Sequence, residues 1–141
     1  MSNIPRSEFK DEIRKLEFAQ FKQLTAEIWS SWGWKTQVLG SQKESAINIV
    51  ATCDELFQRK EIIHIRQYGS EKLVPLSAVR NCNASRHSQS DADSVVLLTT
   101  GRFSRDAELL GSTLNVKLVE PDKLYSFVRQ GGYFDLVYEY I

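Results

Sequence analysis

The spacing of apolar residues predicts that the chain begins with helix. From Ser7 to Trp32, apolar side chains recur at three- and four-residue steps, and the pattern allows a break near Leu16. The apolar stripe consists of Phe18, Phe21, Leu24, Ile28 and Trp32. Gly33 then ends the helix, because glycine readily adopts the left-handed conformation that closes many helices. We therefore expect a helical N-terminal segment over residues 7–32.

Short apolar runs farther along the chain predict a sheet of about five strands. Their composition and alternation favour strands at residues 34–39, 47–51, 62–66, 94–98 and 116–119. Residues 55–59 are typical of a hairpin connection between the second and the third of these strands. The run Ser94-Val95-Val96-Leu97-Leu98 is the most hydrophobic, so we expect it to be a central strand.

Further helices are predicted between and after the later strands. They cover residues 76–87, 105–110 and 121–130, and their starts are supplied by Pro75, Ser104 and Pro121. Gly111 is expected to end the second of these helices, and Gly131-Gly132 the third. The tail from Tyr133 to Ile141 fits both a helix and a strand, and we favour the helix.

The order of these elements predicts the fold class. Helix, three strands, helix, strand, helix, strand and helix make an α/β protein with a mixed central sheet flanked by helices. The first three strands can form an antiparallel meander, whereas the later strands, joined through helices, add in parallel. The chain has no repeat and no linker. We therefore expect one domain over residues 1–141, with its core at 17–129 and a short C-terminal element at 133–141.

Composition limits the classes of partner. The chain of 141 residues is long enough to bury a core, and its apolar and charged fractions of 42% and 26% are those of a globular protein. Eighteen basic and 18 acidic side chains give a formal net charge of zero, so any nucleic-acid contact must come from a local patch. The two cysteines are far apart, and no apolar leader or membrane span is visible. We expect a cytoplasmic protein without membrane contact.

Four stretches of the chain, in order and at sensible distances, carry a family pattern. They are Trp32-Gly33-Trp34, the strand that ends at Ala51, the segment His64-Ile65-Arg66-Gln67-Tyr68, and the run from Val95 to Ser104. Together they resemble the Mrr-type restriction endonucleases of the PD-(D/E)XK superfamily over residues 17–129. The resemblance implies a restriction-endonuclease-like core.

The resemblance also implies three catalytic positions, and this chain departs from the family at each. The family places Asp where Asn48 stands, Gln or Glu at His64, and Lys at Arg66. A hard divalent metal prefers anionic oxygen ligands, which an amide and an imidazole do not supply, and a guanidinium does not give up a proton. We therefore expect no metal cofactor, and a site that holds a nucleic-acid backbone without cutting it by the usual route.

Other polar residues are candidates for DNA contact. They are Lys22, Lys43, Arg66, Arg80, Arg102 and Thr100. In a chain of zero net charge, the basic residues also fit an ordinary solvated surface, and Thr100 fits a threonine at the end of a buried strand that needs no such role. Asn48 likewise fits a satisfied polar residue at the end of a sheet, and the three tryptophans fit core packing.

Two other functions stay open at this point. An active endonuclease with a rearranged site would use Glu44 as its acid, His64 as a ligand or base, and Mg²⁺ or Mn²⁺. A structural or oligomerisation module would use the aromatic tail at 133–141 for a protein contact. The expected partner is DNA; a homodimer and a protein partner that supplies specificity are further hypotheses.

Overall fold

A computed structural model describes residues 3–40, 47–69, 72–86 and 92–141 of the chain. Two sequence-predicted site residues, Lys43 and Glu44, lie outside these ranges. The strands are β1 (Lys35–Val38), β2 (Ile49–Cys53), β3 (Arg59–Arg66), β4 (Ser94–Thr99) and β5 (Val116–Val119). The helices are α1 (Arg6–Lys15), α2 (Phe18–Ser31), α3 (Leu76–Ser85), α4 (Arg105–Leu114), α5 (Pro121–Gly131) and α6 (Phe134–Tyr138).

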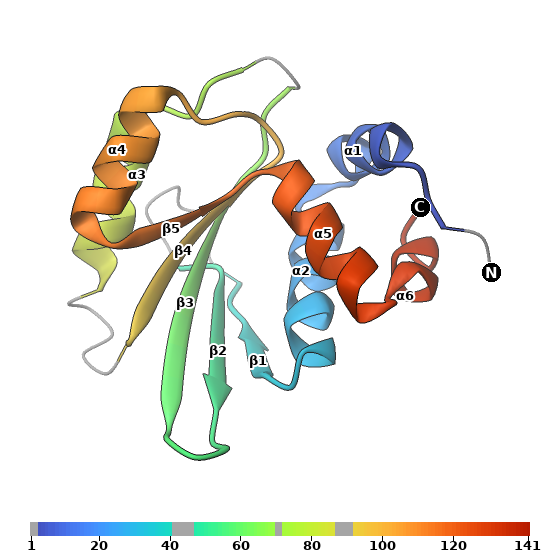
Figure 1. Cartoon of the computed structure of the whole chain (residues 1–141), viewed down its shortest axis with the longest axis horizontal. Helices are drawn as coiled ribbons and strands as arrows, with labels where there is room; N and C mark the ends of the chain where they lie inside the picture. Colours follow the sequence, from blue (N-terminus) through green and yellow to red (C-terminus); the bar gives the residue numbers. More distant parts are fainter. Residues whose placement is uncertain (1–2, 41–46, 70–71, 87–91) are drawn as a thin grey trace.

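The strands form one sheet in the order β1-β2-β3-β4-β5, with helices on both of its faces (Figure 1). β1, β2 and β3 are antiparallel neighbours, and β4 and β5 add in parallel. Ile63 of β3 pairs with Ile49 on one side and with Val96 on the other. The predicted meander with parallel additions is therefore confirmed.

Two apolar cores lie on opposite faces of the sheet. The larger packs β2, β3 and β4 against α1, α2, α5 and α6, and the smaller packs the other face against α3 and α4. Side chains alternate between the two cores along β3, since Ile63 and Ile65 enter the first and Ile62 enters the second. All six residues of β4 are buried, as expected for its hydrophobic run. The faces of β3 thus determine where its polar side chains point.

The N-terminal helical segment is broken where the sequence allows it. Leu16 and Glu17 are extended, and Glu17 forms a capping box with Gln20 at the start of α2. Gly33 has a φ of +97°, as predicted for a left-handed helix end. Trp32, which the sequence places in the apolar stripe, instead follows α2 and is 47% exposed.

The predicted end of α4 is wrong. The helix continues through Gly111 to Leu114 and closes at Asn115, which has a left-handed φ of 56°. A Cβ atom at Gly111 would lie 3.0 Å from the Leu118 side chain and 3.1 Å from the Val116 carbonyl oxygen. This glycine therefore allows α4 to approach β5 closely and does not stop the helix.

The tail is helical, as favoured, and its aromatic residues differ in burial: Phe134 is buried, whereas Tyr138 is 40% exposed. Phe134 and Val137 of α6 are buried in the larger core. The hydroxyls of Tyr133 and Tyr140 donate to the Ser31 carbonyl and to the Glu27 carboxylate of α2. No helix in the described ranges is long and apolar enough to span a bilayer.

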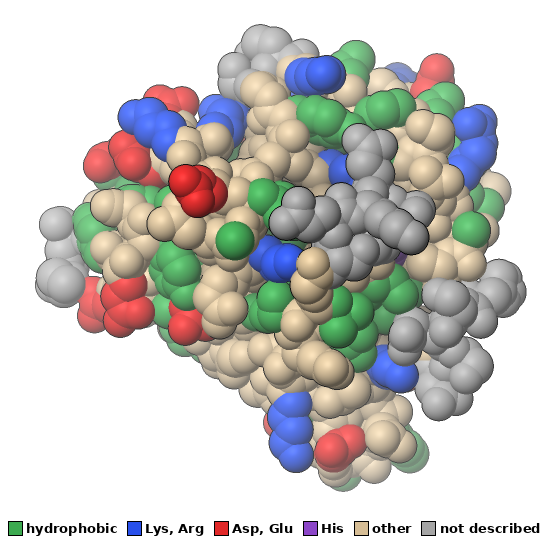
Figure 2. All heavy atoms as spheres, turned by 180° about the vertical axis from the view of Figure 1, so that it is seen from behind, with side chains coloured by type: hydrophobic (Ala, Val, Ile, Leu, Met, Phe, Trp, Pro, Cys, Tyr) green, Lys and Arg blue, Asp and Glu red, His purple; other side chains and the backbone are tan. Residues whose placement is uncertain are grey.

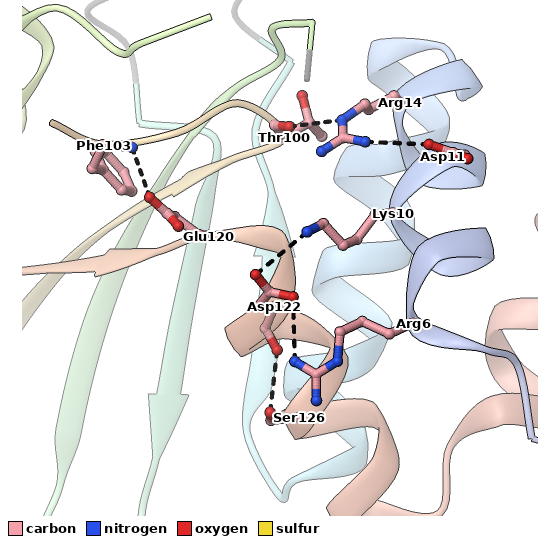
Figure 3. A network of polar contacts seen from close by, with 9 residues as sticks. All are labelled: Arg6, Lys10, Asp11, Arg14, Thr100, Phe103, Glu120, Asp122 and Ser126. Atoms are coloured by element: carbon pink, nitrogen blue, oxygen red, sulfur yellow. Dashed lines mark hydrogen bonds and ion pairs between the residues drawn. The ribbon is translucent and has the colours of Figure 1, made fainter. Parts of the chain in front are cut away.

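A polar network fastens α1 to the sheet and to α5 (Figure 3). Arg6 and Lys10 contact the Asp122 carboxylate at 3.2 and 3.4 Å, and Arg14 Nε donates to the Thr100 carbonyl. Partial burial alone raises the pKa of Asp122, but hydrogen bonds and charge from Arg6 and Lys10 outweigh it and lower that pKa. The network thus holds α1 beside the turn that follows β4.

Candidate functional site

Asn48 lies immediately before β2 and is 2% exposed. Its backbone N–H donates to the Ile63 carbonyl, and its carbonyl accepts from Leu39, so it continues the ladders on both sides. Its side-chain Oδ1 accepts a 2.7 Å hydrogen bond from the backbone N–H of Ile65. The amide oxygen is therefore already used by the sheet, in the manner of a satisfied polar residue at a sheet end.

His64 is fully buried on the face of β3 that packs against α3. Its Nε2 lies 2.8 Å from the Ser85 hydroxyl oxygen, and that hydroxyl donates to the Cys82 carbonyl at 2.6 Å. This contact between His64 Nε2 and the Ser85 hydroxyl connects β3 to α3.

Arg66, the last residue of β3, is 8% exposed on the same face. Its Nη1 donates to the Ile65 carbonyl at 2.9 Å, whereas Nη2 is buried and has no hydrogen-bond partner among the described residues. Burial raises the pKa of the Cys82 thiol to about 12, and the charge of Arg66 opposes that shift. Within the described residues no carboxylate pairs with this guanidinium.

The structure brings Asn48, His64 and Arg66 to one end of the sheet, which we call the β3 end site. They are close in space because Asn48 bonds to Ile65, the residue between the other two. Each side chain has its own recorded partner: the Ile65 N–H, the Ser85 hydroxyl and the Ile65 carbonyl. The predicted positions thus converge, although His64 and Arg66 are buried and do not form a solvated face.

Lys22 and Thr100 lie near this end but are buried. Lys22 Nζ donates to the Leu39 carbonyl at 2.7 Å and so joins α2 to the chain after β1. The Thr100 hydroxyl donates to the Tyr68 carbonyl and accepts from the Tyr68 N–H, which extends the β3–β4 pairing. Both side chains therefore serve the fold. Lys22 is not on the exposed DNA-facing surface expected of it, and Thr100 fits the alternative of a threonine at the end of a buried strand.

Arg80 and Arg102 are exposed, as a role in DNA contact requires. On the face shown in Figure 2, the described Lys and Arg side chains are scattered, and acidic ones gather toward α1 and α6. A pocket of about 400 Å³ beside Arg102 has cations and acids in equal number. They are Lys10, Arg14 and Arg102 with Asp11, Glu120 and Asp122.

Sequence reasoning missed residues that the fold brings to this end. Arg14 reaches the turn after β4 from α1, and Lys72 lies over the Tyr68 ring, 5.2 Å from its centroid. The backbones of Lys72 and Arg102 are hydrogen-bonded, and Gly101 permits this approach, since a Cβ there would lie 2.6 Å from the Lys72 oxygen. The sequence carries no signal for these residues, because Arg14 arrives through the packing of α1, and Lys72 meets Arg102 beside a bridge between the segments that follow β3 and β4.

Asn48, His64 and Arg66 of the β3 end site supply no anionic ligand for a divalent metal. The amide oxygen of Asn48 is engaged by the Ile65 N–H, His64 Nε2 contacts the Ser85 hydroxyl, and Arg66 is a cation. A metal ion prefers anionic or neutral lone-pair donors and is repelled by a buried guanidinium. Among the residues that the structure describes, no cluster of three His, Cys, Asp or Glu side chains is suited to a metal.

The five-stranded sheet, its connections and the flanking helices define a restriction-endonuclease-like fold, and solved enzymes share it. The DNA modification-dependent restriction endonuclease AspBHI is similar over 97% of this chain, with a TM-score of 0.72 and 12% identity. Restriction endonuclease FokI is similar over 98%, with a TM-score of 0.64 and 10% identity. MspJI, solved with a 27-mer oligonucleotide, is similar over 94%, with a TM-score of 0.56 and 19% identity. This chain spans only 38%, 30% and 32% of those three proteins, respectively.

The sequence profile of the Mrr_cat family, described as restriction endonuclease, matches residues 13–128. Because the match covers most of the chain, this protein belongs to the Mrr_cat restriction endonuclease family, and the family resemblance found in the sequence is confirmed. No curated protein matches the sequence.

Proposed function

We propose that this chain is a DNA-binding restriction-endonuclease-like domain that holds a DNA backbone at the β3 end site and does not cleave it. The observation that carries the proposal is the buried Arg66 guanidinium. One of its nitrogens has no hydrogen-bond partner among the described residues, and no described carboxylate neutralises it. A buried, unpaired charge is costly, so an anion that reaches it gains both a charge interaction and a hydrogen bond.

A phosphate group is the anion that best suits this position. The planar guanidinium presents paired N–H donors that match phosphate oxygens. Exposed Arg102 and Lys72 lie on adjoining segments and can contact neighbouring phosphates. The related enzyme MspJI was solved with an oligonucleotide, which supports DNA as the polymer.

The loss of cleavage follows from the chemistry of the same three residues. Metal-dependent hydrolysis needs ligands that hold the ion, and a group or bound water that can lose a proton. Asn48 contributes no charge and uses its oxygen in the sheet, and Arg66 remains protonated. We infer that the domain has kept the family scaffold and lost the usual route to strand scission.

Incubation with supercoiled DNA in Mg²⁺ or Mn²⁺, followed by agarose electrophoresis, tests both parts of this proposal. We expect retarded mobility at low salt and no nicked or linear product after deproteinisation. The triple variant Asn48→Asp, His64→Gln and Arg66→Lys restores the family residues and shows whether the scaffold still supports cleavage. Metal-dependent nicking by the unaltered protein that disappears in Glu44→Ala would contradict the proposal and favour the rearranged site.

A further inference from the structure

A second pocket, of about 480 Å³, opens between α2, the start of β3 and α5. Arg59 and Glu61 of β3 line it, so it lies at the opposite end of that strand from Arg66, roughly 17 Å along the chain. Glu61 faces the larger core side of the sheet, whereas Arg66 faces α3. The pocket is therefore separate from the β3 end site, and its volume is in the range of small-molecule sites.

All three tryptophans of the chain line this pocket. Trp29 packs edge-to-face on Phe127 in its wall, with ring centroids 5.9 Å apart. Trp32 is 47% exposed, although its edge-to-face contact with Tyr133 fixes the ring. Trp34 is half-buried and lies beneath the Arg59 guanidinium, 5.9 Å from the ring centroid. Fixed, partly uncovered indole rings are suited to stack on a planar ligand.

Cations outnumber acids around the pocket. Arg59, Lys117 and Lys123 contribute three positive charges, and Glu61 contributes the one negative charge among the lining residues. The three cations come from β3, β5 and α5, so their charge converges on the pocket from several sides. This excess favours a ligand that carries a negative group.

Glu61 is a buried carboxylate, 5% exposed, that faces the pocket. Its Oε1 accepts a 2.7 Å hydrogen bond from Trp29 Nε1, and its Oε2 contacts Lys117 Nζ at 3.5 Å. The second contact is long and comes from a side chain that is 52% exposed. A carboxylate accepts about four hydrogen bonds, so Glu61 has capacity for the amino group of a ligand.

We propose that this pocket binds a nucleotide, with its base stacked on the tryptophans, its exocyclic amino group on Glu61 and its phosphate toward Arg59, Lys117 and Lys123. Aromatic walls, an acidic floor and a cationic rim match the three parts of such a ligand. The ligand comes either as a free nucleotide or as the unpaired end of a DNA strand, since both present the same chemistry. This inference does not depend on DNA binding at the β3 end site.

Titration calorimetry with AMP, CMP, UMP, adenosine and inorganic phosphate tests the proposal, with tryptophan fluorescence as a second signal. Because every tryptophan lines the pocket, binding should change the fluorescence directly. We expect AMP and CMP to bind at least tenfold more tightly than UMP, which lacks an exocyclic amino group, and than phosphate or adenosine alone. Competition by a 5′-phosphorylated single strand identifies the strand end as the source, and its failure identifies the free nucleotide.

Variants assign the binding to this pocket. Trp32→Ala and Lys123→Glu should each weaken AMP binding roughly tenfold, whereas the charge-matched control Arg105→Glu on α4 should leave it unchanged. Glu61→Gln, which keeps an acceptor for Trp29, should narrow the preference for AMP over UMP. Absence of AMP binding at millimolar concentration by the folded protein would overturn the proposal. Equal binding of phosphate and AMP, or equal effects of Trp32→Ala and Arg105→Glu, would also overturn it.

Discussion

At the residue scale, the Asn48 side chain can be interpreted in two ways, and its contacts explain both interpretations. The family position predicts a replaced metal ligand, whereas the hydrogen bond to Ile65 shows a side chain that completes the β2–β3 ladder. An aspartate in the same place could accept that bond with one oxygen and keep the second for a cation. Asparagine replaces that second oxygen with an amide nitrogen. An aspartate at position 48 could therefore both support the sheet and bind a metal ion, whereas asparagine supports the sheet alone.

Asn48→Ala tests the structural part of this account. The change leaves the buried Ile65 N–H without its acceptor, so we expect a loss of about 1–3 kcal/mol in the free energy of unfolding. Chemical denaturation measures it. Asn81→Ala, on an exposed position of α3, is the matched control and should change stability by only a few tenths of a kcal/mol. If the two variants were equally stable, the hydrogen bond to Ile65 would not be stabilising.

At the element scale, α1 combines a buried apolar face with polar contacts at its surface. Arg6 and Lys10 both contact Asp122 at the start of α5, while Phe9 and Ile13 are buried beneath them (Figure 3). The Asp122 side chain is 49% exposed, so solvent screens these ion pairs and limits their worth. The contribution of these ion pairs to the free energy of unfolding should therefore be small at neutral pH and should depend on the ionisation of Asp122.

Stability against pH tests this contact. Because the folded protein has a lowered Asp122 pKa, the stabilisation is present above the ordinary carboxyl pKa of 3.8 and is lost as pH falls through the folded value. We expect Asp122→Asn to lower the unfolding temperature modestly at pH 7 and to differ less from the unaltered protein near pH 3. The control Asp135→Asn, on an exposed position of α6, should show no such pH dependence. A difference for Asp122→Asn that grows on acidification would contradict the assignment.

At the scale of the whole molecule, local sequence patterns predicted the helices and strands, whereas tertiary contacts determined which residues lie together at the candidate site. The apolar runs located all the strands of the sheet, and Gly33 and Ser104 marked helix boundaries correctly. The prediction that Gly111 ends α4 was wrong, because a glycine is needed there for the close contact with Leu118 of β5. The burial of Lys22 likewise arises from another segment, since its Nζ donates to the Leu39 carbonyl after β1. Residue type alone does not distinguish a basic side chain that is buried in the fold from one that contacts DNA.

The zero net charge of the molecule makes Arg66 decisive for the proposed function. On the face shown in Figure 2, the surface cations are scattered. Under the proposed function, specific phosphate contacts at the β3 end site supply the affinity for DNA. The salt dependence of that affinity reports how many such contacts form, since each releases counterions from the DNA.

The most direct test is the affinity for duplex DNA measured against salt for the unaltered protein, Arg66→Gln and Arg129→Gln. Arg129 is exposed in the last turn of α5 and serves as the matched control. We predict that log affinity falls linearly with log salt, that Arg66→Gln reduces the slope by about one phosphate contact, and that Arg129→Gln leaves it unchanged. Far-ultraviolet circular dichroism verifies that each variant is folded. The same slope and affinity in folded Arg66→Gln as in the unaltered protein would contradict the account.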